Sequence, residues 1–204
     1  MSSDSRAAAT GNQAAGDQSD STLSSGALSR RAFLARLERA KADADSSAAV
    51  FSLCLVDVDQ LRNVNDQHGQ SSGDAVILTV ARETLAALAA PEWRELESSL
   101  GRYDGDSFIL LLDRCRLESA ERFGETLRRR VGDLEIGPAL RATVSIGVAA
   151  YRIGETIDAL LARIEKTLHL AKQFGRDRVE TAWTPQVRDD ASPLAELGKK
   201  ARDR

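Results

Sequence analysis

The chain has few of the features that mark secreted or membrane proteins. It contains only two cysteines in 204 residues, too few for a disulfide framework. Cys54 lies inside an apolar run, so we expect both Cys54 and Cys115 to be free thiols of a reducing cytoplasm. No apolar run approaches the ~18 residues of a membrane-spanning helix, and the N-terminus has no apolar signal core. We therefore expect a soluble, cytoplasmic protein with no membrane contact.

The chain also lacks an excess of charge of either sign. It holds 28 Lys and Arg residues against 31 Asp and Glu residues, which gives a formal net charge of −3. Nucleic acids and anionic membranes select strongly basic surfaces, so this balance argues against a nucleic-acid partner. The length allows one domain of average size with tails. A core of ~150 residues buries roughly 70% of the surface that its unfolded chain exposes.

Both ends of the chain are polar. Residues 1–25 are mostly Ser, Ala, Gly, Asp and Gln, which cannot offset the entropy lost on ordering, so we predict disorder there. Beyond Pro185 the chain turns polar again, with a candidate short surface helix over residues 192–200. We predict one folded domain over residues 26–181, between a disordered tail over residues 1–25 and a polar tail over residues 182–204.

Strand and helix patterns alternate between the tails. The apolar run over residues 49–56 predicts a central strand, and residues 75–88 predict a strong helix that ends before Pro91. Asp59 is a candidate cap for a short helix after the first strand. Apolar spacing predicts further helices over residues 29–38 (with Ser29 as N-cap), 117–134 and 155–174, and strands over residues 142–149 and 178–181.

The most informative stretch is a hairpin signal at Asp104-Gly105, directly before the apolar strand that begins at Phe108. This dipeptide predicts a type I′ turn, with positive φ at both central residues. The resulting antiparallel pair favours a mixed sheet with packed helices over a doubly wound sheet. Asp106 follows this turn. We expect it to lie beside Asp57, which comes directly after the strand over residues 49–56. Two such carboxylates can hold Mg²⁺, although an ordinary Asp-Gly hairpin is the alternative.

The segment from Asp104 to Phe108 resembles the signature of the GGDEF domain, the catalytic unit of diguanylate cyclases. The resemblance extends over residues 26–179 and includes segments 143–148 and 171–176. It implies an α/β fold, the nucleotidyl-cyclase or palm-like mixed β-sheet sandwiched by helices. Near the N-terminus, four residues match the family pattern and four depart from it: Gly26, Arg30, Arg31 and Phe33 match, whereas Thr22, Ser24, Ala27 and Ser29 do not.

The resemblance implies a metal site and a guanine site. Asp57, the carbonyl of Val58 and Asp106 would bind Mg²⁺ or Mn²⁺. Asn65 and Asp74 fall on the pair that hydrogen-bonds guanine. A carboxylate accepts bonds from N1–H and from the exocyclic amine of guanine, so adenine would leave Asp74 unpaired. The structural alternatives are an Asx-turn at Asn65 and a helix N-cap at Asp74.

The resemblance also implies phosphate contacts. Lys172 and Arg176 are four residues apart at the end of the last helix, so one helical turn would let both clamp terminal phosphates. Alternatively they are cations beside the helix dipole, with Gly175 as the cap. Arg62 stands where the family often has Lys, and a solvated cation is equally consistent there. Arg102 matches the arginine that precedes the signature.

Two signature positions depart from the family. Asp104 replaces the first glycine, and Ser107 replaces the second acid, which the family keeps as Glu for attack of a 3′-hydroxyl on an α-phosphate. Serine can neither take up a proton nor carry the charge, so we expect a rate loss of ~10³-fold or more. Asp106 keeps the other acid.

The family's inhibitory product site is also altered. Its Arg-x-x-Asp positions hold Glu95 and Ser98, and the displaced Arg94-x-x-Glu97 has the wrong acid, so we expect no cyclic di-GMP site there. Two histidines, His68 and His169, have no metal-ligand companions in the sequence.

These features predict a degenerate GGDEF domain of bacterial cyclic di-GMP signalling. It would bind GTP with Mg²⁺, have weak or no cyclase activity, and act as a regulatory or interaction module. The alternative is an active dimeric cyclase that condenses two GTP molecules to cyclic di-GMP and pyrophosphate. A structural remnant without nucleotide is a third reading. Expected partners are GTP, a second GGDEF protein in a homodimer or heterodimer, and a further signalling protein.

Overall fold

The computed structural model describes residues 26–137 and 140–182. The predicted tails lie outside the described residues except for Ala182, whose backbone N–H bonds to the carbonyl of Val148 at 2.7 Å, so it belongs to the folded domain. The elements within this part alternate as the sequence pattern predicts. In chain order they are α1 (Arg30–Ser47), β1 (Phe51–Val58), α2 (Leu61–His68), α3 (Gln70–Leu88), β2 (Ser98–Asp104), β3 (Ser107–Asp113), α4 (Leu117–Gly132), β4 (Val144–Ala150), α5 (Ile157–Gln173) and β5 (Val179–Thr181).

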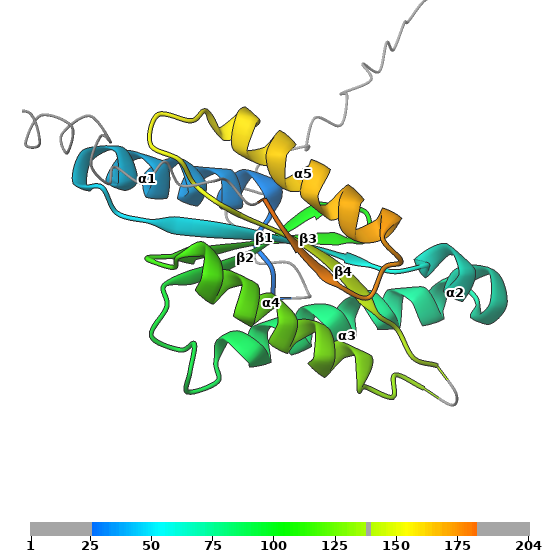
Figure 1. Ribbon diagram of the computed structural model, residues 1–204. Coiled ribbons are helices and arrows are strands. Elements are labelled where there is room, and N and C mark those ends of the chain that lie inside the picture. Colours follow the sequence, from blue (N-terminus) through cyan, green and yellow to red (C-terminus); the bar gives the residue numbers. More distant parts are fainter. Residues whose placement is uncertain (1–25, 138–139, 183–204) are drawn as a thin grey trace, which may run out of the picture.

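The strands form one five-stranded mixed sheet in the order β2-β3-β1-β4-β5 (Figure 1). The central strand β1 pairs antiparallel with both β3 and β4. The edge strand β5 runs parallel to β4. Because β2 and β3 form an antiparallel hairpin, the predicted mixed sheet is confirmed.

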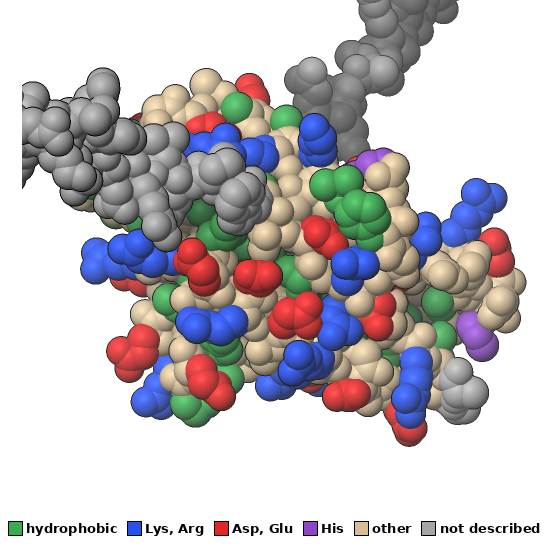
Figure 2. All heavy atoms as spheres, viewed as in Figure 1, with side chains coloured by type: hydrophobic (Ala, Val, Ile, Leu, Met, Phe, Trp, Pro, Cys, Tyr) green, Lys and Arg blue, Asp and Glu red, His purple; other side chains and the backbone are tan. Residues whose placement is uncertain are grey.

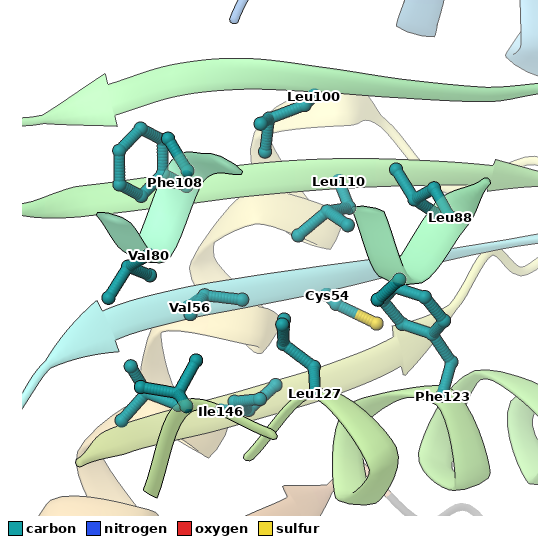
Figure 3. Close-up of a cluster of buried hydrophobic side chains, with 14 of the residues drawn as sticks. Cys54, Val56, Val80, Leu88, Leu100, Phe108, Leu110, Phe123, Leu127 and Ile146 are labelled. Atoms are coloured by element: carbon teal, nitrogen blue, oxygen red, sulfur yellow. The ribbon is translucent and has the colours of Figure 1, made fainter. Parts of the chain in front are cut away.

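Helices cover both faces of the sheet: α1 and α5 lie on one face, and α3 and α4 on the other (Figure 1). Every residue of β1 is buried. Side chains alternate along a strand, so Cys54 and Val56 pack with α3 and α4 (Figure 3), whereas Leu53 and Leu55 pack with α1 and α5. This double cover explains why β1 is continuously apolar rather than alternating.

Several predicted element boundaries need correction. The side chain of Ser29 does cap α1, accepting a bond from the backbone N–H of Ala32 at 3.3 Å. However, α3 begins at Gln70 rather than at residue 75, which places Asp74 inside the helix. The residue that precedes α2 as its N-cap is Gln60, not Asp59. The carboxylate of Asp59 is unavailable for capping because it bonds to other elements, as described below.

The hairpin turn also differs from the prediction. Strand β2 ends at Asp104 and β3 begins at Ser107, so the turn residues are Gly105 and Asp106. Of these two, only Gly105 has a positive φ, of 20°. The predicted type I′ turn centred on Asp104-Gly105 is therefore wrong. A register shift between Arg102 and Asp104 moves the turn along the chain.

Other features agree with the sequence. Cys54 and Cys115 are buried free thiols. Acidic and basic side chains are interspersed over the face shown in Figure 2. Within the described residues, no helix combines the length and apolar character that crossing a membrane requires.

Helix α5 approaches the sheet closely at Gly147 of β4. A Cβ atom at this position would lie 2.7 Å from the backbone nitrogen of Leu168 and 2.8 Å from the backbone oxygen of Ile164. Both atoms belong to the backbone of α5, so no side-chain rotation can relieve such a contact. The absence of a side chain at Gly147 thus sets the height of α5 above the sheet.

We predict that Gly147→Ala destabilises the fold by about 1–3 kcal/mol, the usual range for overpacking. The matched control is Gly132→Ala in α4, where no heavy atom beyond the adjacent residues and the helix's own backbone lies within 4 Å of the added Cβ. That variant should be neutral or slightly stabilising, because Ala favours helix more than Gly. Urea denaturation of both variants measures the difference, and equal stabilities would contradict the close approach.

Candidate functional site

The candidate site lies at one end of the sheet, on the right in Figure 1. The C-terminal end of β1 meets the β2–β3 turn there, because β3 runs antiparallel to β1. Helix α2 follows β1 at the same end, and the C-terminal end of α5 lies above it. The fold therefore brings Asp57, Ser107 and Lys172 together at this end of the sheet.

Asp57 is the buried centre of this site, with only 5% of its surface exposed. It pairs directly with Ser107 across β1 and β3. The hydroxyl of Ser107 donates to Oδ2 of Asp57 at 2.7 Å. The ammonium of Lys172, from the last turn of α5, lies 2.6 Å from Oδ1. Both carboxylate oxygens of Asp57 therefore already have a partner.

The protonation of Asp57 is set by opposing influences. Burial is the largest and raises the pKa of the carboxyl above its usual value. Hydrogen bonds from Lys172 and Ser107 lower the pKa, while repulsion from Asp106 adds a smaller rise. The sequence prediction that Asp57 and Asp106 lie near one another is consistent with this repulsion. The charged form of Asp57 thus depends on Lys172 and Ser107.

A pocket of about 250 Å³ opens beside this group. Its lining adds side chains from the hairpin and from α5, namely Tyr103, Asp104, Glu165 and His169. Typical small-molecule pockets enclose ~300–1,000 Å³, so the cavity fits only part of a nucleotide.

The arrangement does not fit a preformed divalent metal site. A hard cation needs carboxylate oxygens that no other cation already holds, and at Asp57 an ammonium contacts one oxygen while a hydroxyl donates to the other. The other two predicted ligands are Val58, the last residue of β1, and Asp106, which lies in the turn between β2 and β3. Among the described residues, no three His, Cys, Asp or Glu side chains come together as a metal cluster. His68 and His169 lie apart in α2 and α5.

The corner between α2 and α3 carries the predicted guanine pair. The side chain of Asn65 packs on Gly73, with Oδ1 only 1.9 Å from where a Cβ atom would stand. This Oδ1 is buried and accepts no hydrogen bond, so the Asx-turn alternative is wrong. Asp74 is exposed inside α3, whose N-cap is Gly69, so the N-cap alternative is wrong as well. The exposed carboxylate of Asp74 is therefore open to another partner, whereas the Oδ1 of Asn65 is enclosed.

The predicted phosphate clamp is only partly assembled. Helix α5 ends at Gln173, and Gly175 and Arg176 have positive φ values of 114° and 64°. The backbone N–H of Arg176 bonds to the carbonyl of Ala171 at 3.0 Å, as in a Schellman cap. Gly175 thus forms the predicted cap. Lys172 and Arg176 do not lie one helical turn apart, because the helix stops between them.

Two further arginines lie away from Asp57. Arg102 donates to the carbonyl of Gly105, and its guanidinium carbon lies 4.9 Å from the ring centre of Phe108. It therefore braces the hairpin turn. The side chain of Arg62 is 92% exposed, with its nearest acid, Asp66, at 3.9 Å, which matches a solvated cation.

The positions of the family's inhibitory site lie at the start of β2. Ser98 is the first residue of this strand, and Glu95 is exposed in the turn before it. The expected absence of a cyclic di-GMP site at Glu95 and Ser98 stays a prediction.

Asp59 is a structural centre that the sequence reasoning missed. Its buried carboxylate accepts bonds from the hydroxyls of Ser145 at 2.6 Å and Thr143 at 2.8 Å, and from the backbone N–H of Asp177 at 3.0 Å. Asp177 in turn pairs with Arg128 of α4 at 2.8 Å. A signal was present, since Asp57 and Asp59 are two residues apart on an extended chain and so share a face.

Tyr103 is a second missed residue. Its hydroxyl bonds to Glu165 of α5, and the guanidinium carbon of Arg30 lies 5.4 Å from its ring centre. Burial, and then the bond to Glu165, raise the pKa of Tyr103 to about 12. The contact connects the start of α1, the signature hairpin and α5. Only the fold brings these three segments together.

Comparison with known proteins identifies the family of this chain. A family profile described as "Diguanylate cyclase, GGDEF domain" matches residues 25–178. The chain therefore belongs to the GGDEF diguanylate cyclase family of cyclic di-GMP signalling. Diguanylate cyclases of this family generally use divalent metal ions.

Curated relatives agree with this assignment. The chain is 38% identical over 157 residues to diguanylate cyclase DgcM of Escherichia coli K12, covering 77% of this chain and 37% of the relative. Diguanylate cyclase DgcP of Pseudomonas aeruginosa is 29% identical over 160 residues, 77% of this chain and 23% of the relative. The chain thus spans about a quarter to a third of the length of these relatives.

Solved structures show the same fold. The GGDEF domain of DgcB from Caulobacter crescentus, in complex with c-di-GMP, superposes with a TM-score of 0.70 at 28% identity, covering 77% of this chain and 92% of that chain. Diguanylate cyclase SiaD of Pseudomonas aeruginosa, in complex with its activator SiaC, gives 0.71 at 32% identity, with coverages of 77% and 59%.

We predict that Asp59→Asn costs about 1–3 kcal/mol of stability, because an amide NH₂ would face donors where an acceptor is needed. The matched control is Asp66→Asn, whose exposed side chain lies 3.9 Å from Arg62. It should change stability by less than about 0.5 kcal/mol. Thermal unfolding of both variants tests the difference. An Asp59→Asn protein as stable as the control would refute the central role of Asp59.

Proposed function

We propose that this protein is a degenerate GGDEF domain that binds GTP, has little or no diguanylate cyclase activity, and acts as a regulatory or interaction module. The observation that carries the proposal is the state of Asp57, whose two oxygens are bound by Ser107 and Lys172. Where the family has a second acid, this chain supplies only a hydroxyl that donates to the first.

The guanine preference rests on Asn65 and Asp74. The Oδ1 of Asn65 is buried against Gly73, so the group that Asn65 would offer to guanine is its amide NH₂, which can donate to O6 or N7. Asp74 is exposed next to it in α3 and can accept two bonds from the N1–H and amine edge of guanine. Adenine would leave that carboxylate unpaired, so the pair favours GTP over ATP.

The chemistry would be slow for an electrostatic reason. In the family reaction the 3′-hydroxyl oxygen of one GTP bonds to the α-phosphorus of the other, the hydroxyl proton leaves, and pyrophosphate departs. Ser107 cannot take that proton at neutral pH or add negative charge. Asp106 is the acid that remains. Loss of one such group costs ~10³-fold or more in rate.

The proposal includes the ion and partners that fit a GTP-binding module. Mg²⁺, with Mn²⁺ as the alternative, would arrive on the phosphates of the nucleotide rather than at a preformed protein site. Partners would be a second GGDEF domain, in a homodimer or heterodimer, and a signalling protein. The two free thiols are consistent with a cytoplasmic location.

The second candidate function is an active diguanylate cyclase. This candidate is favoured because the chain keeps both Asp57 and Asp106. Asp57 lies beside Lys172 and is repelled by Asp106, so charged groups meet at one end of the sheet. A cyclase would need two copies of the domain, each holding one GTP.

Titration calorimetry with GTP and ATP tests the proposal. Wild-type protein should bind GTP at least ~10-fold more tightly than ATP, a difference of about 1.4 kcal/mol. Asp74→Ala should remove this preference while leaving phosphate affinity in place. Asp158→Ala, on the first turn of α5, is the control and should keep the preference. Equal affinities for both nucleotides, or no GTP binding, would reject the guanine site.

A further inference from the structure

We propose that Lys172 is a built-in cation for Asp57, so that Lys172 and a divalent metal ion compete for the same carboxylate. In the domain without nucleotide, this competition is the reason that the end of the sheet at Asp57 offers no ready metal site. The competition is independent of GTP binding.

The contacts at Asp57 set the two cations against each other by charge repulsion. The ammonium of Lys172 lies 2.6 Å from Oδ1, a charge-assisted contact. The hydroxyl of Ser107 uses Oδ2 at 2.7 Å. Mg²⁺ binds oxygen at ~2.0–2.1 Å and would repel an ammonium on the same oxygen. A metal ion therefore binds Asp57 more weakly while Lys172 holds the carboxylate.

Burial explains why the lysine stays in the absence of a competitor. Asp57 is 5% exposed, and a buried carboxylate without a partner is strongly destabilising. Lys172 is anchored at its backbone, because α5 rests directly on the sheet at Gly147. Its side chain is 35% exposed, so the flexible stem has a path to solvent. Lys172 can therefore release Asp57 without movement of the helix.

The residue at position 107 decides the balance between the two cations. The contact pair of Asp57 and Lys172 carries one negative and one positive charge, so with Ser107 its sum is zero. A glutamate at position 107 would leave a net negative charge to attract a dication. Asp106 adds a negative charge near Asp57 in either case. Glu165 accepts the hydroxyl of Tyr103, and Asp104 accepts the backbone N–H of Gly105.

The test measures binding of Mn²⁺ alone, without nucleotide, by titration calorimetry and by the loss of the free Mn²⁺ EPR signal. Wild type should bind Mn²⁺ weakly at this site, and Lys172→Met should bind it at least ~10-fold more tightly. The matched control is Lys166→Met, an exposed lysine of the same helix, which should behave as wild type. Adding Asp57→Asn to Lys172→Met should abolish the gain.

Equal Mn²⁺ affinities for wild type and Lys172→Met would overturn the proposal, as would a gain that survives Asp57→Asn. If Lys172→Met does not fold, Ser107→Glu keeps the lysine and gives a second test. That variant should also bind Mn²⁺ at least ~10-fold more tightly, and an unchanged affinity would overturn the proposal. GTP is absent throughout, so failure of the GTP-binding proposal would leave these results interpretable.

Discussion

The burial of the Asp57 carboxylate is the constraint on which the site depends. A charge on a central strand, covered by α5, needs partners that replace water. The register of β1 against β3 brings the hydroxyl of Ser107 to one oxygen, and α5 brings Lys172 to the other. The hairpin, the central strand and the last helix therefore meet at a single side chain.

The rest of the domain keeps these partners in place. Gly147 lets α5 lie directly on β4, which fixes the height of Lys172 above the sheet. Asp59 ties the end of β1 to β4 and to the backbone that follows α5. Tyr103 joins the hairpin to Glu165 and lies beneath Arg30. Changes in α1 thus have a physical route to the signature hairpin.

The sequence predicted the sheet because its strongest patterns are local. The apolar run before Asp57 and the Asp104-Gly105 signal are sufficient to expect a buried central strand and an antiparallel hairpin, although the predicted turn type and its position were wrong. The pairing of Lys172 with Asp57 was not predictable, because it depends on how α5 packs on β4. The prediction that Arg176 lies one helical turn beyond Lys172 was wrong, because the helix ends in a Schellman cap at Gly175 before it reaches Arg176. The sequence suggested Asp59 only as a helix cap. Its actual partners could not be predicted, because Thr143 and Ser145 are distant in the chain.

The most direct test of the account follows labelled GTP with Mg²⁺ and measures both bound nucleotide and cyclic di-GMP. Wild type should retain GTP and form product very slowly or not at all. The Asp104→Gly/Ser107→Glu double variant, tethered to a dimerising coiled coil, should form product at least ~10-fold faster than tethered wild type, a barrier lower by about 1.4 kcal/mol. A tethered double variant that binds GTP without making product would contradict the account. So would wild-type turnover at the rate of a cyclase with an intact signature.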